Sequence, residues 1–169
     1  IELHDLKGLM FSATCSNPIT SLTFSKNSEL VATGLSDGSI SYWNIKSRKS
    51  KLLQTGSGIS IISLSISADN RYLAATSSSG KLFIFDIQSD SENEVVIIEG
   101  EMACTNATFN HNSNLIGAVF SDASKGYAQV WSTQTGAPVT TKLSNNSSIT
   151  NISFPDKGNS IIVWPNNKL

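Results

Sequence analysis

The chain has 169 residues, of which 39% are hydrophobic, 8% aromatic and 15% charged, and its formal net charge is −1. This length suits one domain that buries about 70% of its unfolded-chain surface. The near-neutral charge argues against an electrostatic nucleic-acid binder, and no apolar run approaches the roughly 18 residues that a membrane-spanning helix needs.

An apolar-alternating stretch that ends in Phe or Ile recurs four times along the chain. The copies end at positions 24, 66, 109 and 154, which gives spacings of 42, 43 and 45 residues. A polar turn and a second apolar stretch follow each copy, so we predict two strands in each of four units. The predicted first strands are Ile19–Phe24, Ile61–Ile66, Cys104–Phe109 and Ile149–Phe154, and the second strands are Leu30–Thr33, Tyr72–Thr76, Leu115–Phe120 and Ser160–Trp164.

A third stretch built around an aromatic residue completes the pattern, and the N-terminal residues resemble it. No stretch has apolar residues at i, i+3, i+4 and i+7 over ten residues, so we predict an all-β chain with essentially no helix. The predicted third strands are Ile1–Leu6, Ser39–Ile45, Lys81–Ile87 and Tyr127–Ser132, and weaker fourth strands are predicted at 10–14, 51–55, 94–98 and 138–143.

Four strands in each unit of about 40–45 residues is the period of a WD40 propeller, and the sequence resembles the WD40 family over nearly its whole length. The family's Trp-Asp dipeptide has divergent counterparts in His4-Asp5, Trp43-Asn44, Phe85-Asp86 and Trp131-Ser132. The resemblance implies a β-propeller segment of about four blades, each of four antiparallel strands. The implied units are a half blade at 1–14, full blades at 15–56, 57–99 and 100–143, and a half blade at 144–169.

In the WD40 family, a His before the innermost strand joins a Ser or Thr, a turn Asp and the Trp in a hydrogen-bonded network. The matching His positions here hold Cys15, Ser57, Gly100 and Asn145. The other three members are matched in one unit only, by Thr33, Asp37 and Trp43. We therefore expect that the usual network cannot form and that the blades depend more on apolar packing.

The loops between second and third strands are the candidate contact surface. Ser36-Asp37-Gly38 has the composition of a tight hairpin turn, which is its main expected role. The longer loop at 121–126 is the favoured contact loop, because in the family these loops lie on the face where partners dock. The candidate partner-binding residues are Ser36, Ser78, Asp122, Ser124 and Lys125.

Two charged loops are expected on the opposite face of neighbouring blades. The first is basic and the second is acidic, which is typical of a solvated surface, with a charged docking strip as the alternative. The residues concerned are Lys46, Arg48, Lys49 and Lys51 in one loop, and Asp90, Glu92 and Glu94 in the other.

Residues for catalysis or metal binding are sparse. His4 falls at a Trp position and is expected in the core, whereas His111 lies in a predicted turn, and neither has a second ligand at metal-binding spacing. Cys15 and Cys104 are expected to be small buried hydrophobes, with no base assigned to either as a nucleophile would need. We therefore expect no catalytic residue, no metal and no cofactor.

Four N-x-S/T sequons bear on the compartment: Asn106, Asn145, Asn146 and Asn151. Two of them, Asn106 and Asn151, fall in predicted innermost strands, where we expect that a glycan cannot fit. The two unpaired cysteines agree with a reducing environment. We expect an intracellular, cytoplasmic protein.

The leading hypothesis is a non-enzymatic scaffold or sensor module within a larger intracellular signalling or assembly protein. It would bind a protein or peptide, and neither nucleic acid nor a membrane. The alternative is a propeller enzyme, such as a hydrolase with its site at the channel mouth, and a third interpretation is a purely structural set of blades. Carboxylates at the inner-strand entries would favour the enzyme, but these positions hold Asn17, Ser60, Ala103 and Ser148.

The strand count predicts an open ring. Two N-terminal, twelve central and two C-terminal strands would make four blades. Related rings have more, about seven or eight blades. An open arc exposes apolar faces that soluble monomers rarely tolerate. We expect that further blades elsewhere in a longer chain complete the ring, since both ends break off inside a repeat; the alternative is a second copy of the chain.

Overall fold

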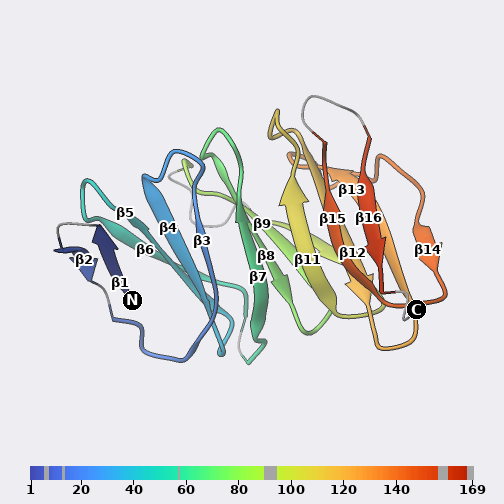
Figure 1. Cartoon of the computed structure of the whole chain (residues 1–169), viewed down its shortest axis with the longest axis horizontal. Helices are drawn as coiled ribbons and strands as arrows, with labels where there is room; N and C mark the ends of the chain where they lie inside the picture. The colour runs from blue at the N-terminus through green and yellow to red at the C-terminus, as the bar shows by residue number, and fades with distance from the viewer. Residues whose placement is uncertain (6–7, 13, 57, 90–94, 156–159, 167–169) are drawn as a thin grey trace.

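The computed structural model describes residues 1–5, 8–12, 14–56, 58–89, 95–155 and 160–166. This part of the chain contains sixteen strands and no helix, which confirms the all-β prediction. The strands form five antiparallel sheets that stand side by side in chain order, with the two termini at opposite ends (Figure 1).

Three four-stranded sheets form the middle of the molecule, and in each the strands pair in chain order. Their Ile, Val, Thr and aromatic residues favour extended backbone that packs on both faces. The first sheet is β3 (Ile19–Phe24), β4 (Leu30–Leu35), β5 (Ser39–Asn44) and β6 (Ser50–Gln54); the second is β7 (Ile61–Ile66), β8 (Tyr72–Ser77), β9 (Lys81–Asp86) and β10 (Val95–Glu99); the third is β11 (Cys104–Phe109), β12 (Leu115–Ser121), β13 (Gly126–Ser132) and β14 (Leu143–Asn145).

A two-stranded sheet flanks this group at each end. The N-terminal one is β1 (Glu2–Asp5) with β2 (Gly8–Ser12), and the C-terminal one is β15 (Ile149–Ser153) with β16 (Ile162–Pro165). The predicted sequence of two, twelve and two strands is therefore confirmed. Most strand ends lie within one or two residues of the predicted ones.

The fourth strand of the third full sheet is the exception, because the predicted strand at 138–143 is wrong. Pro138 has no N–H to donate and makes only an isolated bridge to Trp131. The Thr140 side chain then takes a ladder position, since its Oγ1 accepts the N–H of Val130 at 3.1 Å. The chain leaves the sheet there and pairs again only at β14.

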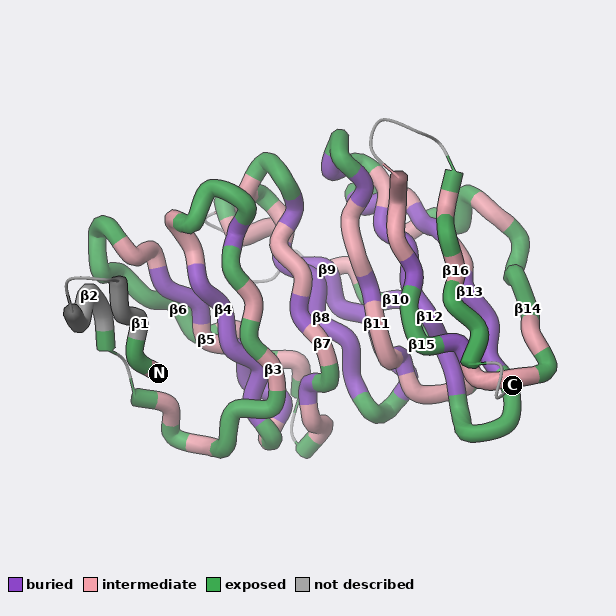
Figure 2. Tube along the Cα trace, in the orientation of Figure 1, coloured by how far each residue is buried: buried purple, intermediate pink, exposed green. Residues whose placement is uncertain are grey.

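The core lies between neighbouring sheets rather than within one layer (Figure 2). The second strands β4, β8 and β12 are buried along almost their whole length. The largest cluster joins the second and third full sheets and contains Leu82, Ile84, Ile116 and Phe120. Each such side chain contributes about 1.5–3 kcal/mol when fully buried, so contacts between sheets hold the arc together.

The inner strand of the first sheet lacks the cover that later sheets receive. Ile61 is 0% exposed and Ile152 is 1% exposed, whereas Ile19 and Leu22, at the corresponding positions of β3, are 41% and 46% exposed. The N-terminal sheet has only two strands and supplies no inner pair to cover them. The described arc therefore ends in an apolar face at β3.

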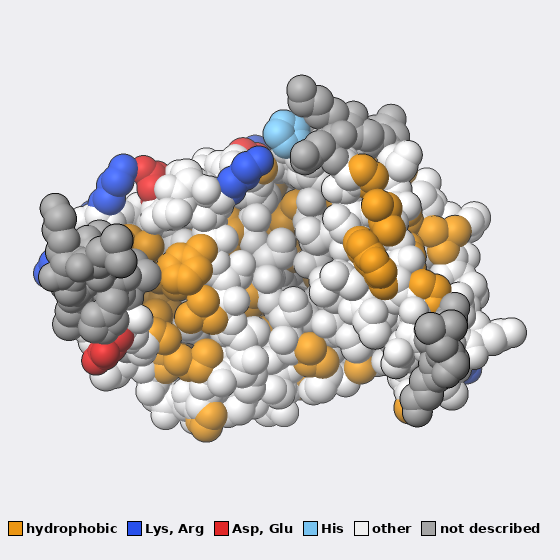
Figure 3. Space-filling view, in the orientation of Figure 1, with side chains coloured by type: hydrophobic (Ala, Val, Ile, Leu, Met, Phe, Trp, Pro, Cys, Tyr) orange, Lys and Arg blue, Asp and Glu red, His pale blue; other side chains and the backbone are white. Residues whose placement is uncertain are grey.

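The C-terminal sheet ends in a second apolar face. Ile162 and Trp164 of β16 are 46% and 43% exposed. Hydrophobic side chains gather over β3 and over β15 and β16 in Figure 3. Both ends of the described arc thus have the exposed apolar faces that the sequence predicted for an open ring.

Candidate partner-binding surfaces

The turn between β4 and β5 is a structural hairpin, as predicted. Gly38 has a φ of +88°, and its N–H donates to Leu35 O at 3.2 Å. Asp37 Oδ1 accepts hydrogen bonds from the backbone N–H and the hydroxyl of Ser39 at 3.0 and 2.6 Å. These bonds, the Ser39 hydroxyl first, hold the pKa of Asp37 below its ordinary value.

The three turns between second and third strands share one backbone anchor. The N–H at the start of each turn donates to a carbonyl just before the inner strand of the same sheet, at 3.0–3.2 Å. The side chains of Ser36 and Ser78 remain exposed at the tips. We call the end of the sheets that carries these turns the hairpin face. The three bonds are Ser36 to Pro18, Ser78 to Ser60 and Ser121 to Ala103.

The longest of these turns is braced by its own aspartate. Asp122 Oδ1 accepts the N–H groups of Ser124 and Lys125 at 2.7 and 2.9 Å and the Ser124 hydroxyl at 2.8 Å. These bonds keep the pKa of Asp122 below its ordinary value. The loop is exposed and also ordered from within, since Asp122 N–H donates to Lys125 O.

The five candidate partner-binding residues are all exposed and lie on turns of the hairpin face. Asp122, Ser124 and Lys125 share one loop, whereas Ser36 and Ser78 belong to two different sheets. Their binding of a partner stays a prediction.

The four-residue polar network expected of the family is split in two. Cys15 occupies the His position, and its Sγ lies 3.7 Å from Thr33 Oγ1. The Cys15 side chain also packs on Val31 and Trp43. Asp37 is held separately, because its Oδ2 accepts a hydrogen bond from Asn17 Nδ2 at 2.6 Å. Thr33 and Asp37 thus have different partners, and the absence of the usual network in this unit stays a prediction.

The third full sheet fills the corresponding space with aromatic rings. A Cβ at Gly100 would lie 2.1 Å from Cδ1 of Phe120. That ring stacks on Tyr127 at 5.0 Å and meets Trp131 edge-on at 5.8 Å. Apolar packing has replaced the polar network here. Of the other two His positions, Ser57 lies outside the described residues, and Asn145 accepts the N–H of Ser147 at 2.9 Å.

The charged residues of the opposite face are only partly within the described part of the chain. Lys46 pairs with Glu29, and this hydrogen bond lowers the pKa of the Glu29 carboxyl. Arg48, Lys49 and Lys51 are exposed. The acidic residues Asp90, Glu92 and Glu94 lie outside the described residues, so the charged docking strip stays a prediction.

The predictions for the histidines and cysteines are confirmed only in part. Cys104 is fully buried, and burial raises the pKa of its thiol, which confirms the structural prediction. Cys15 is only partly buried. His111 is exposed in its turn, as expected, and the side chain of His4 lies outside the described residues.

The prediction that a glycan cannot fit on an inner strand is wrong for one of the two sequons concerned. Asn106 and Asn151 lie on the inner strands β11 and β15, as predicted, and are joined by a hydrogen bond of 3.1 Å. Asn151 is nevertheless exposed, because the inner strands of an open arc line no closed channel. Burial therefore does not exclude a modification at Asn151.

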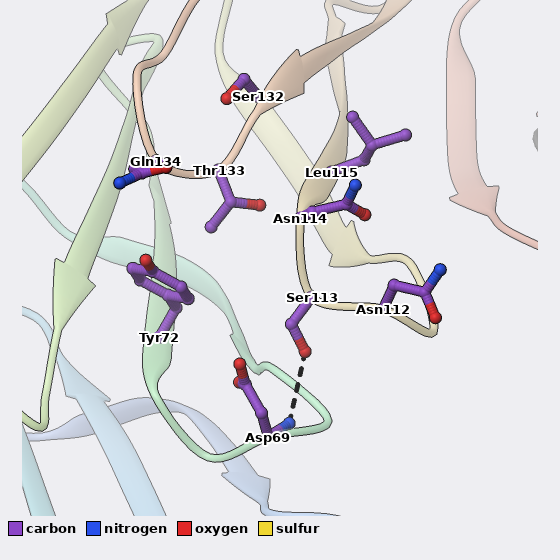
Figure 4. A pocket seen from close by; sticks show the side chains of 9 residues that line it. All are labelled: Asp69, Tyr72, Asn112, Ser113, Asn114, Leu115, Ser132, Thr133 and Gln134. Carbon is purple, nitrogen blue, oxygen red and sulfur yellow. Dashed lines mark hydrogen bonds between the residues drawn. The ribbon is translucent and has the colours of Figure 1, made fainter.

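A polar pocket of about 320 Å³ opens on the opposite face, between the second and third full sheets (Figure 4). Residues of three turns line it: Asp69 and Tyr72 from the second sheet, and 112–115 and 132–134 from the third. An interblade hydrogen bond from Asp69 N–H to Ser113 Oγ, at 3.3 Å, closes its lower side in Figure 4.

The same local structure builds the two turns on either side of this pocket. Ser67 and Asn110 each use a side-chain oxygen to accept the N–H five residues later, at 2.8 and 3.0 Å. Asn70 and Ser113 take a left-handed backbone with φ near 60°. Serine and asparagine suit such turns because their side chains replace backbone partners.

Sequence reasoning did not identify this pocket. The dense run of amides around His111, at Asn110, Asn112 and Asn114, was a visible signal. The pocket itself forms only where turns of two blades meet, and their relative placement is not encoded in local pattern.

The described residues contain neither a candidate metal site nor a membrane-spanning helix. No group of three or more His, Cys, Asp or Glu residues there is arranged to hold a metal ion. The described part also contains no helix of the length and hydrophobicity that crossing a membrane would require.

The family model of the WD domain, G-beta repeat, matches residues 9–44 and 50–86. These two segments are WD40 repeats. Each matched segment begins in the last strand of one sheet and ends in the third strand of the next, so every repeat links two neighbouring sheets.

The chain is also similar to a curated protein, the Protein LST8 homolog of Drosophila melanogaster. The two are 30% identical over 78 residues, which are 46% of this chain and 25% of that protein. The chain therefore spans about a quarter of the length of this relative.

Solved structures of WD40 propellers have the same fold. A chain of the mitotic checkpoint complex superposes with a TM-score of 0.70 at 15% identity, over 87% of this chain and 45% of that one. The WD40 repeats of RRP9 and the protein U3-55K each give 0.69 at 18% identity, over 83% of this chain and 43% of theirs. This chain thus corresponds to less than half of each of those chains.

Proposed function

We propose that this WD40 segment is a non-enzymatic scaffold or sensor module within a larger intracellular signalling or assembly protein, and that its hairpin face binds a protein or peptide. WD40-repeat proteins are generally interaction scaffolds. The observation that carries the proposal is the shared anchor of the three turns, which holds their exposed tips on buried strands. A rigid base with exposed tips loses little conformational entropy when a partner binds.

The loop at 121–126 is the proposed centre of this contact. Its bracing by Asp122 uses the backbone N–H groups of Ser124 and Lys125 and leaves the Lys125 side chain exposed to meet a partner in one preformed shape. Ser36 and Ser78 would form the outer part of the surface. The proposal assigns no catalytic, metal or cofactor site, and a protein partner rather than nucleic acid or membrane, in keeping with the net charge of −1.

The proposal also includes completion of the ring, by further blades of a longer chain or by a second copy. Support comes from the apolar end faces of β3 and β16, which correspond to buried positions in the middle sheets. The unit boundaries 1–14, 15–56, 57–99, 100–143 and 144–169 are part of this proposal.

Site-specific photocrosslinking in the full-length protein tests the contact face. A benzoylphenylalanine replaces Ser124, and a matched variant carries it at Lys51, which is also exposed but lies on β6. We expect a discrete crosslinked partner from position 124 and none from position 51. Equal crosslinking at both positions, or none from position 124, would reject the hairpin face as the binding surface.

A further inference from the structure

We propose that the pocket between the second and third full sheets binds the guanidinium group of an arginine side chain from a protein partner, with Asp69 as its counter-ion. This site lies on the face opposite the proposed hairpin contact and does not depend on it. Figure 4 shows the Asp69 carboxylate and the Thr133 side chain projecting toward the same space from turns of two different sheets.

The Asp69 carboxylate is available for an external cation. Its Oδ1 accepts the Ser67 hydroxyl and the N–H of Arg71, and the Ser113 side chain also stabilises the charged carboxylate. The neighbouring Arg71 guanidinium pairs with Asp86 at 2.8 Å and lies over the Tyr72 ring, 5.1 Å from its centroid. Burial opposes ionisation, but the hydrogen bonds from Ser67, Arg71 and Ser113 together lower the pKa of Asp69, so the carboxylate is charged at neutral pH.

Thr133 provides the second, independent observation. Thr133 is 1% exposed, and its hydroxyl has no hydrogen-bond partner among the described residues. Buried polar groups are nearly always paired, so an unpaired hydroxyl in the wall of a pocket is unusual. The exposed side chains of Asn114 and Gln134 lie beside it in Figure 4.

The chemistry of the lining favours a ligand with several donors. Hydroxyl, amide and carboxylate groups line the space together with the apolar surface of Tyr72 and Leu115, and no lysine or arginine lines it. A guanidinium presents five N–H donors in a planar fork, which suits acceptors on opposite walls, whereas the ammonium of lysine is a compact point charge. The volume of about 320 Å³ accommodates one side chain with water around it.

In the binding experiment, the protein is titrated with the probe N-acetyl-arginine methylamide. Binding is monitored through the NMR chemical shifts of the side-chain amides of Asn112, Asn114 and Gln134. We expect saturable shifts in the millimolar range. The neutral isostere N-acetyl-citrulline methylamide should bind about tenfold more weakly or not at all, and the lysine analogue should fall between them.

Three variants complete the test. Asp69→Asn keeps an oxygen for Ser67 and Arg71, and should weaken arginine binding by about tenfold; Thr133→Val keeps the shape and should weaken it by about threefold. Glu99→Gln, which neutralises an exposed carboxylate of β10 outside the pocket, is the matched control and should leave the titration unchanged. Melting curves establish that each variant is folded, and if Asp69→Asn fails to fold, Thr133→Val and the citrulline probe decide. No saturable shift with the arginine probe, equal binding of citrulline, or unchanged affinity in folded Asp69→Asn would overturn the proposal.

Discussion

The side chain of Ile61 occupies the space that a side chain at Gly34 would need. A Cβ added at Gly34 would lie 2.4 Å from Cγ2 of Ile61, and Ile61 itself is fully buried. The two residues belong to β7 and β4, so this contact joins two neighbouring blades. It fixes how closely the inner strand of one sheet approaches the second strand of the sheet before it.

Replacing Gly34 should therefore destabilise the chain by pushing two blades apart. We expect Gly34→Val to lower the free energy of unfolding by about 1–3 kcal/mol, the usual cost of overpacking, and Gly34→Ala to cost less. Urea titration followed by tryptophan fluorescence measures the change. Ser36→Ala, on an exposed turn of the same sheet, should stay within about 0.5 kcal/mol of the unmodified chain. A neutral Gly34→Val would show that the blades adjust freely.

The uneven cover of the inner strands gives a second prediction. Ile61→Ala should cost about 2–5 kcal/mol, because it opens a cavity in a packed interface. Ile19→Ala removes the same atoms at the corresponding position of β3, which is 41% exposed, and should cost less than half as much. Comparing the two denaturation midpoints tests this directly. Equal losses would mean that β3 is covered in solution.

Much of this architecture was predictable because it is local. Strand length, alternation and turn residues are written in each repeat, and they placed β3, β7 and β11 at the observed residues. The prediction of the fourth strand of the third sheet failed because the pairing becomes irregular after the Pro138 bridge, where the N–H groups of Val139 and Thr140 both donate to Val130 O. Asn151 proved exposed because the exposure of an inner-strand residue depends on how sheets pack together, which the local pattern does not determine.

The candidate surfaces divide in the same way. The turn at Asp37 and Gly38 was predicted from a dipeptide whose backbone preference is local. The pocket around Asp69 and Thr133 was not, because their proximity depends on how two blades pack. Likewise, the contact of Cys15 with Thr33 could not be derived from composition, since cysteine is a weak hydrogen-bonding group that also packs as a small hydrophobe.

The unpaired hydroxyl of Thr133 gives a third prediction, on stability alone. Thr133→Val replaces a buried hydroxyl that has no partner among the described residues with a methyl group of similar size. We expect the free energy of unfolding of the ligand-free chain to rise by about 1 kcal/mol, because the cost of burying the unpaired oxygen is removed. The measurement is the urea midpoint at neutral pH. A clear loss of stability would mean that the hydroxyl is hydrogen-bonded in solution.

The braced aspartates predict a loss of stability in acid. The folded-state pKa values of Asp37, Asp69 and Asp122 are lowered, so each carboxylate contributes stability above its unfolded pKa of about 3.9, and this contribution disappears as pH falls through the folded value. The urea midpoint should therefore decrease below about pH 4. In the Asp122→Asn variant, the fall of the urea midpoint between about pH 5 and about pH 3 should be smaller, because one titrating group is gone. An identical pH profile would contradict the role given to Asp122.

The last prediction concerns the two apolar end faces. Ile162 and Trp164 of β16 occupy positions on a second strand that face the next blade in the middle sheets, as Gly34 faces Ile61. The exposed Ile19 and Leu22 of β3 are the surface that such a blade would cover. If two copies complete one ring, light scattering of this chain should give a discrete dimer, and Trp164→Arg should convert it to monomers. If blades of a longer chain complete the ring, the isolated chain should instead associate without a fixed stoichiometry, and the longer protein should be monodisperse. A stable monomer in which the two terminal two-stranded sheets meet and close a four-bladed ring would refute both, because its end faces would already be buried.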